Sequence, residues 1–332
     1  MMIEVRTETI FQALADKTRL RIVRLLDSKE LAVGELAQVL GQSQPRVSRH
    51  VAILCDAGLA ERRREGSWVF IRRSSGVEGS QQLAIETSRL LAAAERVDWE
   101  LAAICEADRR RVTEIYEARE GHASAYFAAH AEQWDELRQM HSPDQLVERA
   151  LTRALEGKPL GRVLDIGTGT GRMAEIFASD AQSVVALDKS LDMLRLARAK
   201  LQHLPSERVE LVQGDFTALP FPAHSFDTVL LHQVLHFARD SAAALAEAAR
   251  VTRSDGRIAI VDFAAHDHEE LRERHAHARL GFADEQIVQA LGKAGCDVSE
   301  PLALEGGALV VKIWIATRRS SPVGVALRQA SA

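Results

Sequence analysis

Residues 162–171 constrain the fold of this chain more than any other stretch. The apolar run Arg162-Val163-Leu164-Asp165-Ile166 predicts a buried strand, and Gly167, Gly169 and Gly171 follow it before a helical stretch begins at Arg172. A strand, a glycine-rich turn and a helix in this order are typical of a parallel sheet covered by helices, in which ligands bind beyond the carboxyl ends of the strands.

The same alternation continues along the chain. Helical stretches at 191–201 and 242–251 separate four further predicted strands, at 183–188, 208–215, 226–231 and 257–262. Alternating strands and helices predict a doubly wound, Rossmann-like α/β sheet that is wrapped on both faces.

Acidic residues at the ends of the second and third strands suggest a ligand site. Asp188 ends the second strand, 17 residues after Gly171, and Gly214-Asp215 ends the third. The turn has the pattern Asp-x-Gly-x-Gly-x-Gly, whereas a dinucleotide site needs Gly-x-Gly-x-x-Gly to receive a pyrophosphate at the helix N-terminus. One carboxylate can accept from two ribose hydroxyls and the other from an adenine amino group. The pattern therefore predicts a site for an adenosine without phosphates.

This body, from Val163 to Arg318, resembles the class I S-adenosylmethionine (SAM) methyltransferases, especially those of ubiquinone and menaquinone biosynthesis. The resemblance rests on the glycine turn and the two strand-end acids. It implies SAM as the cofactor, with the turn under the methionine part, Asp188 at the ribose, and Asp215 and Phe216 at the adenine. It also implies an antiparallel hairpin, 302–304 with 309–315, that closes the sheet. The implied cofactor-binding residues are Asp165, Gly167, Thr168, Gly169, Gly171, Asp188, Lys189, Met193, Gly214, Asp215, Phe216 and His232.

Methyl transfer from a sulfonium is an in-line displacement, so the protein mainly aligns the reactants and excludes water. A general base helps only if the acceptor must lose a proton. His232 and His236 follow the fourth strand at i and i+4, and they share a face if this segment is a short helix. Both are candidate catalytic residues toward a small-molecule acceptor; the alternative is that they are hydrogen-bonded packing residues. His122 and Tyr126 are candidates for a lid.

The remaining histidines and the cysteines predict no metal site. If residues 266–277 form one helix, His268 and His275 lie about 10 Å apart along its axis, too far for one ion with ligands at about 2 Å. An acceptor-site lid and a solvated helix remain as interpretations of this segment. Cys55, Cys105 and Cys296 are scattered, which disfavours arsenite as the acceptor and excludes a disulfide framework.

The charge of the chain is unevenly distributed. Residues 1–75 hold 13 Lys/Arg and 9 Asp/Glu, a balance of +4, and the remainder holds 29 and 38, a balance of −9. A basic head on an acidic body is typical of a protein that meets a polyanion, although a solvated charged face gives the same balance.

The head has the pattern of a helix-turn-helix. Helices are predicted at 8–14, 18–26, 30–40 and 43–57; Asp16 and Ser43 are the expected N-caps, Gly41 ends the third helix, and Pro45 lies in the first turn of the fourth. Val47, Val51 and Leu54 form its inward face. The outward residues expected to meet phosphates and base edges are Ser43, Gln44, Arg46, Ser48, Arg49 and His50.

Two short strands, 59–61 and 67–72, predict a wing whose tip is Arg62-Arg63-Arg64-Glu65-Gly66, with the three arginines reaching phosphates or the minor groove. The head resembles the ArsR/SmtB winged-helix repressors on Leu14-Ala15-Asp16-Lys17-Thr18-Arg19, on residues 43–54, on Ala57-Gly58-Leu59 and on Arg64-Glu65-Gly66. The resemblance implies operator DNA and a homodimer. The family's Cys-x-Cys metal site is absent, because residues 31–36 contain no cysteine. A winged helix used only for protein contact is the alternative.

The sequence predicts four parts: a winged helix-turn-helix at 1–75, a helical dimerisation and linker segment at 76–120, a methyltransferase domain at 121–318, and a flexible tail at 319–332. Helices are expected at 81–119, 122–140 and 143–155. An apolar stripe on the first of these would support dimerisation; it comprises Leu83, Leu90, Leu91, Ala94, Val97, Leu101 and Ile104. With no apolar run long enough for a membrane span and no signal-peptide pattern, we expect a cytoplasmic protein.

Two hypotheses of different classes follow. In the first, the chain is a regulator that binds DNA and also methylates a small molecule. In the second, the methyltransferase-like body only senses SAM or S-adenosylhomocysteine, and its occupancy biases operator binding through linkage. Turnover distinguishes the two.

Overall fold

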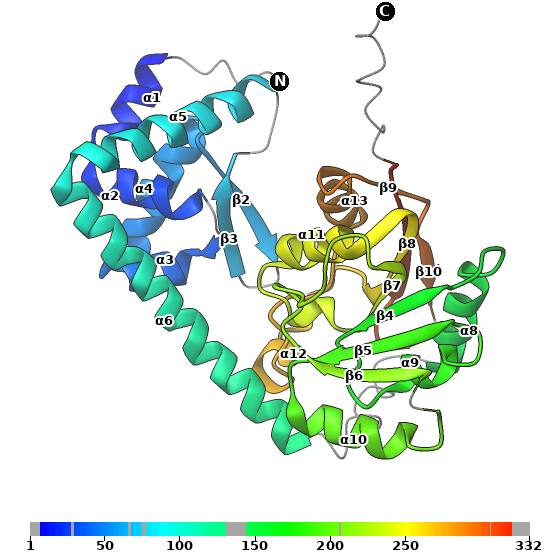
Figure 1. Ribbon diagram of the computed structural model, residues 1–332. Helices are drawn as coiled ribbons and strands as arrows, with labels where there is room; N and C mark the ends of the chain where they lie inside the picture. Colours follow the sequence, from blue (N-terminus) through cyan, green and yellow to red (C-terminus); the bar gives the residue numbers. More distant parts are fainter. Residues whose placement is uncertain are drawn as a thin grey trace, which may run out of the picture. The chain divides into compact units, whose positions relative to one another are not determined.

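A computed structural model of the chain (Figure 1) describes residues 7–27, 30–65, 68–74, 78–130, 144–205, 207–305 and 307–320. The chain divides into two compact units, residues 1–123 and residues 124–332. Each unit is described by itself.

Unit 1 contains a winged helix-turn-helix, as predicted. A three-stranded antiparallel sheet has the order β1-β3-β2. In chain order the elements are α1 (Thr7–Leu14), α2 (Lys17–Leu26), β1 (Leu31–Ala32), α3 (Val33–Leu40), α4 (Gln44–Asp56), β2 (Ala60–Glu65), β3 (Trp68–Arg73), α5 (Glu78–Val97) and α6 (Trp99–His130), the last seven residues of which belong to unit 2.

The helix ends of unit 1 follow local chemistry. The Asp16 carboxylate accepts from the backbone N–H of Arg19 at 3.0 Å and caps α2. Gly41 ends α3 at φ 65°, a left-handed conformation that glycine adopts without strain. Ser43 occupies the N-cap position of α4 as predicted, but its side chain makes no capping hydrogen bond.

Two expectations for the wing were wrong. Leu31 and Ala32 were predicted as helix, but they pair with Ile71 and Phe70 as a short strand. The three arginines were predicted at the wing tip, but they lie within β2, where each is paired with a residue of β3. The apolar run of β3, Trp68 to Ile71, extends the pairing over the whole arginine run of β2.

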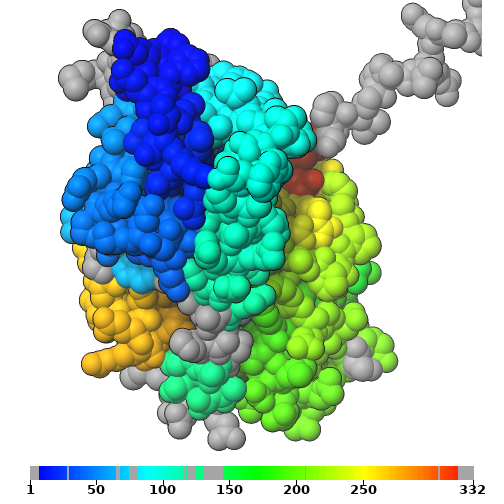
Figure 2. All heavy atoms as spheres, turned by 90° about the vertical axis from the view of Figure 1, so that its left-hand side faces the viewer, coloured from blue at the N-terminus to red at the C-terminus, as the bar shows by residue number. Residues whose placement is uncertain are grey.

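The predicted single helix at 81–119 is two helices. The chain breaks at Asp98, whose Oδ1 accepts from the backbone N–H groups of Glu100 and Leu101 at 3.0 Å and so starts α6. Arg21 of α2 donates two hydrogen bonds to the buried Asp108 carboxylate, at 2.6 and 2.7 Å, which fixes α6 against the winged helix. Figure 2 shows the cyan α5 and α6 against the dark-blue N-terminal helices, in agreement with the packing of α5 on α2.

Unit 2 is a doubly wound α/β sheet, as predicted, with the strand order β10-β11-β8-β7-β4-β5-β6 (Figure 1). Strands β6, β5, β4, β7 and β8 are parallel, and β11 pairs antiparallel with β8, β10 and β9. Its elements are α8 (Asp144–Ala154), β4 (Arg162–Ile166), α9 (Arg172–Phe177), β5 (Ser183–Asp188), α10 (Leu191–Leu201), β6 (Val209–Gln213), β7 (Phe226–His232), the 3-10 turn η2 (Leu235–Phe237), α11 (Ser241–Val251), β8 (Thr252–Phe263), α12 (Glu269–Arg274), α13 (Asp284–Lys293), β9 (Cys296–Val298), β10 (Leu302–Leu304) and β11 (Val311–Arg318).

Adjacent residues of the central strand β4 pack into two separate hydrophobic cores, one on each face of the sheet. Leu164 belongs to the core that α11 and α13 cover, whereas Val163 belongs to the core that α8, α9 and α10 cover. Because successive side chains of a strand point to opposite faces, this sheet is buried on both sides. The arrangement leaves the carboxyl ends of β4, β5, β6 and β7 as the edge at which loops gather.

The expected helix at 122–140 is part of α6 as far as His130, and residues 131–140 lie outside the described ranges, as does the predicted tail beyond residue 320. Over the helices that the structure describes, none is both long enough and apolar enough to cross a membrane.

Candidate functional site

The glycine turn follows β4 and leads into α9. Gly167, Gly169 and Gly171 all have positive φ, at 69°, 54° and 85°. A Cβ on Gly167 would stand 2.2 Å from a methyl carbon of Val234, in the loop that leaves β7. The turn therefore needs glycine for its backbone conformation and, at Gly167, for the close approach of the β7 exit.

Most backbone N–H groups of this turn donate hydrogen bonds to acceptors within the protein. Those of Gly167 and Thr168 both donate to the carbonyl of Leu187, at 2.8 and 2.9 Å, and that of Gly171 donates to the carbonyl of Thr168. The N–H of Gly169 donates to Asp188 Oδ2 at 2.9 Å. A pyrophosphate site instead directs such N–H groups at the ligand, so this turn fits a ligand without phosphates.

The strand-end acids lie along the same edge. Asp188 ends β5, and its second oxygen accepts from the N–H of Ser190 at 2.8 Å. Burial raises the pKa of Asp188 above its ordinary value, against the opposing effect of these backbone donors. The N–H of Gly214 donates to the carbonyl of Asp188 at 3.0 Å, so the exit of β6 is fixed beside the exit of β5.

Asp215 is joined to Asp188 through the next residue in the chain, Lys189. The Lys189 Nζ donates to Asp215 Oδ2 at 2.8 Å. Partial burial works against ionisation of Asp215, but the hydrogen bonds from Lys189 and Thr217 prevail and lower its pKa. The glycine turn, Asp188 and Asp215 are thus linked by direct hydrogen bonds through Gly169, Lys189 and Gly214.

This edge fits a SAM molecule by its donor and acceptor set. The Asp188 carboxylate accepts backbone N–H groups at both oxygens, and its remaining lone pairs leave acceptor capacity for a ribose hydroxyl. Asp165 is buried and accepts from the Thr168 hydroxyl at 2.6 Å under the turn. Met193 is buried in the first turn of α10, and Phe216 packs against the core beside Asp215.

The exit of β7 differs from the expectation. His232 is the last residue of β7 and His236 lies in the 3-10 turn η2, so the two histidines do not share a helix face. Gln233 between them has φ 51°, an uncommon left-handed conformation for a non-glycine residue and one that clusters at functional sites. Its side-chain Nε2 is buried, with no hydrogen-bond partner in the described part of the chain.

His236 is held by an acid that the sequence analysis did not select. Its Nδ1 lies 2.8 Å from Oδ1 of Asp262, and its backbone N–H donates to Oδ2 of the same carboxylate at 3.1 Å. Both side chains are almost completely buried. Asp262 lies near the carboxyl end of β8, as Asp188 lies at the end of β5, and this shared position was the signal that would have identified it.

Aromatic rings surround this pair. The His277 ring stacks on that of His236 at 4.1 Å, and Phe237 and Phe263 lie 4.1 and 5.2 Å from it. At the end of α6, Phe127 lies edge-on to Phe237, and the Tyr126 hydroxyl lies 2.8 Å from Nδ1 of His275. Tyr126, one of the two lid candidates, therefore contacts the histidine-rich segment 266–277. The side chain of the other candidate, His122, lies outside the described part of the structure.

The histidine-rich segment is not one helix. Helix α12 comprises only Glu269–Arg274, with His268 and His275 at its two ends. Among the described residues, no group of three His, Cys, Asp or Glu side chains could hold a metal ion. His266 packs beside Phe263, and burial lowers its pKa to about 4, with His268 and His236 contributing.

The predicted DNA-contacting residues of unit 1 separate into two groups. Ser43, Gln44, Arg46 and Arg49 are exposed on α4, Ser48 is half-exposed, and Arg62 and Arg64 are exposed on β2. His50 and Arg63 do not face outward as expected. The His50 ring is 14% exposed and lies 3.6 Å from the Asp16 carboxylate, while Arg63 pairs with Glu30 at 2.8 Å and lies over the Phe70 ring.

Comparison with known proteins finds one family model that matches within each unit. Residues 16–62 match the model of the bacterial regulatory proteins of the arsR family, and residues 164–260 match a methyltransferase domain model. The chain thus combines a segment similar to the arsR-family regulatory proteins with a segment similar to a methyltransferase domain. The matches cover α2 to β2 of the winged helix and β4 to β8 of the sheet.

Several curated relatives match the methyltransferase domain. A demethylmenaquinone methyltransferase of Renibacterium salmoninarum is 36% identical over 115 residues, which are 35% of this chain and 46% of the relative. The uncharacterized methyltransferase YcgJ of Bacillus subtilis is 38% identical over 101 residues, 30% of this chain and 40% of that protein. The chain thus spans less than half the length of either relative.

A solved complex between the Haloferax volcanii Trm112 methyltransferase activator and a methyltransferase contains a chain that matches with a TM-score of 0.52. The match has 20% identity and covers 60% of this chain and 98% of the other. At this identity the likeness shows the fold alone, which is the Rossmann-like sheet of unit 2.

Proposed function

We propose that the protein is an operator-binding regulator whose second unit transfers a methyl group from SAM to a small-molecule acceptor. The observation that carries the proposal is the hydrogen-bonded edge of Gly169, Asp188, Lys189 and Asp215, on a chain that begins with an ArsR-type winged helix. Operator binding requires contact with the chromosome, so the proposal includes a cytoplasmic location.

The cofactor assignment follows the motif positions. The turn residues with Asp165 and Thr168 would lie under the methionine part, Asp188 would bind the ribose, and Met193, Gly214, Asp215 and Phe216 would surround the adenine. Lys189 would keep Asp215 ionised and in place, because it donates to that carboxylate. When bound, SAM supplies a methyl group already activated on a sulfonium.

The acceptor half of the site is assigned to His236, with His232 at the adjoining strand end. With Nδ1 directed at Asp262, a neutral His236 carries its proton on Nδ1 and presents Nε2 as a base. Nε2 would receive the proton that an acceptor O–H or N–H loses when it is methylated. Asp262 acts as a positioning residue, since it fixes the ring and its tautomer.

The DNA-binding half is assigned to the exposed donors of α4 and β2. Arg49 and Gln44 would read base edges, and Ser43, Arg46, Ser48, Arg62 and Arg64 would contact phosphates or bases. His50 and Arg63 are omitted because the His50 ring faces Asp16 and Arg63 pairs with Glu30.

A homodimer completes the proposal. Leu83, Leu90, Val97 and Trp99 are exposed on α5 and at the start of α6, by 41%, 59%, 85% and 82%. Side chains of this size seldom lie so exposed in one short stretch without a partner surface, and a second copy of this chain would cover them. Dimerisation would also place two α4 helices on one operator.

A second candidate function is supported by the burial of the proposed base. The His236 side chain is 4% exposed, so an acceptor must displace neighbouring side chains to reach it. A regulator that binds SAM or S-adenosylhomocysteine without turnover needs no such access.

One titration tests these functions together. The operator is first selected from random duplexes by the full-length protein, and its affinity is then measured alone, with SAM and with S-adenosylhomocysteine. Calorimetry gives the cofactor affinities, and S-adenosylhomocysteine release in the presence of acceptor candidates gives turnover. Absence of SAM binding would reject the methyltransferase assignment, and absence of duplex selection would reject the operator assignment.

A further inference from the structure

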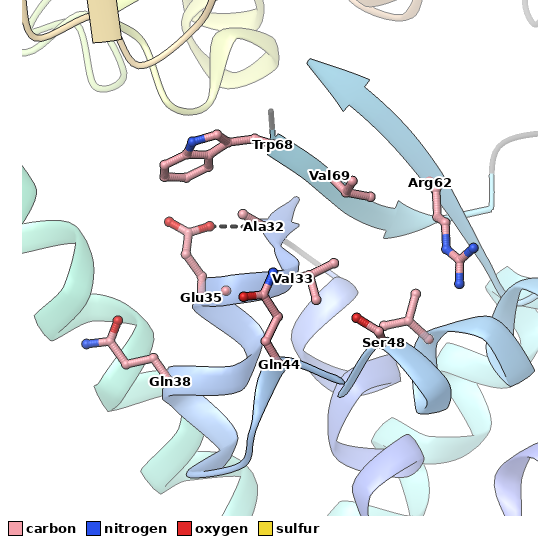
Figure 3. Close-up of a pocket in the computed structure, with 11 residues that line it drawn as sticks. Ala32, Val33, Glu35, Gln38, Gln44, Ser48, Arg62, Trp68 and Val69 are labelled. Carbon is pink, nitrogen blue, oxygen red and sulfur yellow. Dashed lines mark hydrogen bonds between the residues drawn. The ribbon is translucent and has the colours of Figure 1, made fainter. Parts of the chain in front are cut away.

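A groove of about 530 Å³ lies in unit 1 between the helix-turn-helix and the wing (Figure 3). Residues 32–35 and Gln38 contribute from β1 and α3, Gln44, Ser48 and Val51 from α4, and Arg62, Trp68 and Val69 from the wing. Three residues predicted to contact DNA, Gln44, Ser48 and Arg62, therefore line one groove, and they share it with Gln38 and Trp68, which the sequence analysis did not select.

The groove has an apolar part and a donor-rich part. In Figure 3, Trp68 projects from β3 above Glu35, whereas Arg62 projects from β2 toward Ser48. Gln38, Gln44, Ser48 and Arg62 all carry side-chain donors suited to phosphate oxygens. The carboxylate of the lining, Glu35, is buried and accepts from the backbone N–H of Ala32 at 2.7 Å.

Trp68 is held in place by a series of contacts along the wing. Its ring stacks on Phe70 at 5.8 Å with an interplanar angle of 28°, and the Arg63 guanidinium lies 4.9 Å from the centroid of Phe70. Glu30 pairs with Arg63 at 2.8 Å. The series explains why Arg63 does not face DNA: it supports the ring under Trp68, and an indole fixed in this way loses little conformational entropy when it contacts a ligand.

We propose that this groove holds one sugar–phosphate strand of the DNA duplex, with Trp68 packed on a deoxyribose and Arg62, Gln44 and Gln38 at the phosphates. The alternation of apolar sugar and anionic phosphate along a strand matches the two parts of the groove. The groove is also continuous with α4, and the basic balance of residues 1–75 favours a polyanion over a neutral ligand. This inference rests on the proposed DNA-binding function and adds Trp68 and Gln38 to it.

The test uses full-length protein and two probes, a duplex of random sequence and the selected operator, over a range of salt concentrations. Trp68→Ala should weaken binding to both duplexes several-fold and by the same factor, with an unchanged slope of log affinity against log salt, because a sugar contact releases no counterion. Trp68→Phe should bind nearly as the wild type does. Arg62→Gln should reduce the salt slope by about 0.9, the value for one lost phosphate contact.

Arg195→Gln is the matched control, since this arginine is 79% exposed on unit 2 and should leave affinity and slope unchanged. Gln38→Ala, at an exposed position of α3, should weaken binding to both duplexes without changing the salt slope. It replaces Trp68→Ala if that variant does not fold. Wild-type affinity and slope in Trp68→Ala, Gln38→Ala and Arg62→Gln would overturn the groove assignment while DNA binding by α4 stood. Failure of the wild type to bind either duplex would instead reject the proposed function.

Discussion

Asp262 of β8 accepts three hydrogen bonds from the segment around His236 and from its own neighbour. Oδ1 lies 2.8 Å from His236 Nδ1 and accepts from the N–H of Phe263 at 2.8 Å, and Oδ2 accepts from the N–H of His236 at 3.1 Å. A single buried carboxylate therefore fixes both the ring and the backbone of the η2 turn. The relationship joins the ends of two neighbouring strands, β7 and β8, at the edge where the cofactor residues gather.

Asp262→Asn should lower turnover by about 10²- to 10⁴-fold, the range for loss of a general base. An asparagine amide directed at Nδ1 would leave the proton of His236 on Nε2, where it blocks proton acceptance. SAM affinity measured by calorimetry should not change, since Asp262 is not among the assigned cofactor residues. The exposed Asp267→Asn is the control, and full turnover in Asp262→Asn would remove His236 as the base.

Asp262→Ala should also destabilise unit 2 by about 3 kcal/mol or more, because it leaves buried donors without an acceptor and each such group costs about 1–3 kcal/mol. Urea unfolding followed by circular dichroism measures the loss. Asp262→Asn, which retains one carbonyl acceptor, should lose less than Asp262→Ala, and equal stabilities of the two variants would contradict this account.

Asp188→Ala should abolish SAM binding and leave the sheet folded. The change removes the carboxylate that orders Gly169 and is assigned to the ribose. Asp192→Ala is a matched control in the next helix, since that carboxylate pairs with Arg195 on the surface. Calorimetric affinity in Asp188→Ala equal to that of the wild type would reject the cofactor site.

Gly167→Ala should destabilise unit 2 and weaken SAM binding. The new methyl group would overlap Val234, and φ of 69° is strained for alanine, so we expect a loss of about 1–3 kcal/mol, typical of overpacking. Val234→Ala in the same chain should recover part of the loss by removing the γ-methyl groups. Lack of any recovery in the double variant, measured by thermal unfolding, would assign the effect to φ alone.

Stability of unit 2 should fall between pH 6.5 and pH 4. His266 has a folded pKa of about 4 against an ordinary value of 6.5, mainly because of burial. In this pH window His266 is protonated in the unfolded chain and neutral in the folded chain. The free energy of unfolding therefore decreases as the pH falls, by up to about 3 kcal/mol. Urea unfolding at a series of pH values measures this decrease. His266→Phe should make the free energy of unfolding less dependent on pH in this range. An unchanged pH dependence in that variant would assign the loss of stability at low pH to other groups.

Val97→Glu should produce monomers, because it places a charge in the apolar surface assigned to a second copy. Light scattering after size exclusion measures the mass, and Arg89→Glu, at an exposed charged position of the same helix, is the control. A wild-type monomer, or an unchanged dimer in Val97→Glu, would remove α5 from the interface.

Local sequence patterns predicted most elements and the cofactor edge. Asp16, Gly41 and Pro45 set helix ends through contacts within one turn, and the glycine turn of residues 167–171 adopts its conformation because of its own residues. Asp188 and Asp215 were predictable for a related reason, since parallel strands bring their carboxyl ends to one edge of the sheet. Each of these inferences needs only the residue types and their spacing.

The errors arose where the partner of a residue is distant in sequence. Arg63 has the same chemistry as Arg62, but it faces Glu30 and Phe70 because the pairing of β2 with β3 sets the alternation. His50 appeared free on a helix until α2 brought Asp16 to it. Spacing alone placed His232 and His236 on one face, but the strand extends to His232 and only a 3-10 turn follows.

The sequence by itself determined the winged helix-turn-helix, the doubly wound sheet and most of their strands and helices, because hydrophobic periodicity and turn chemistry act over a few residues. It also determined the glycines, Asp188 and Asp215 at the sheet edge. The tertiary structure decided which charged and ring side chains meet: Asp262 with His236, Arg63 with Glu30, and Trp68 with the groove. Those contacts depend on strand register and loop closure, which are set by the packing of the whole unit, so residue spacing does not identify the partner of each side chain.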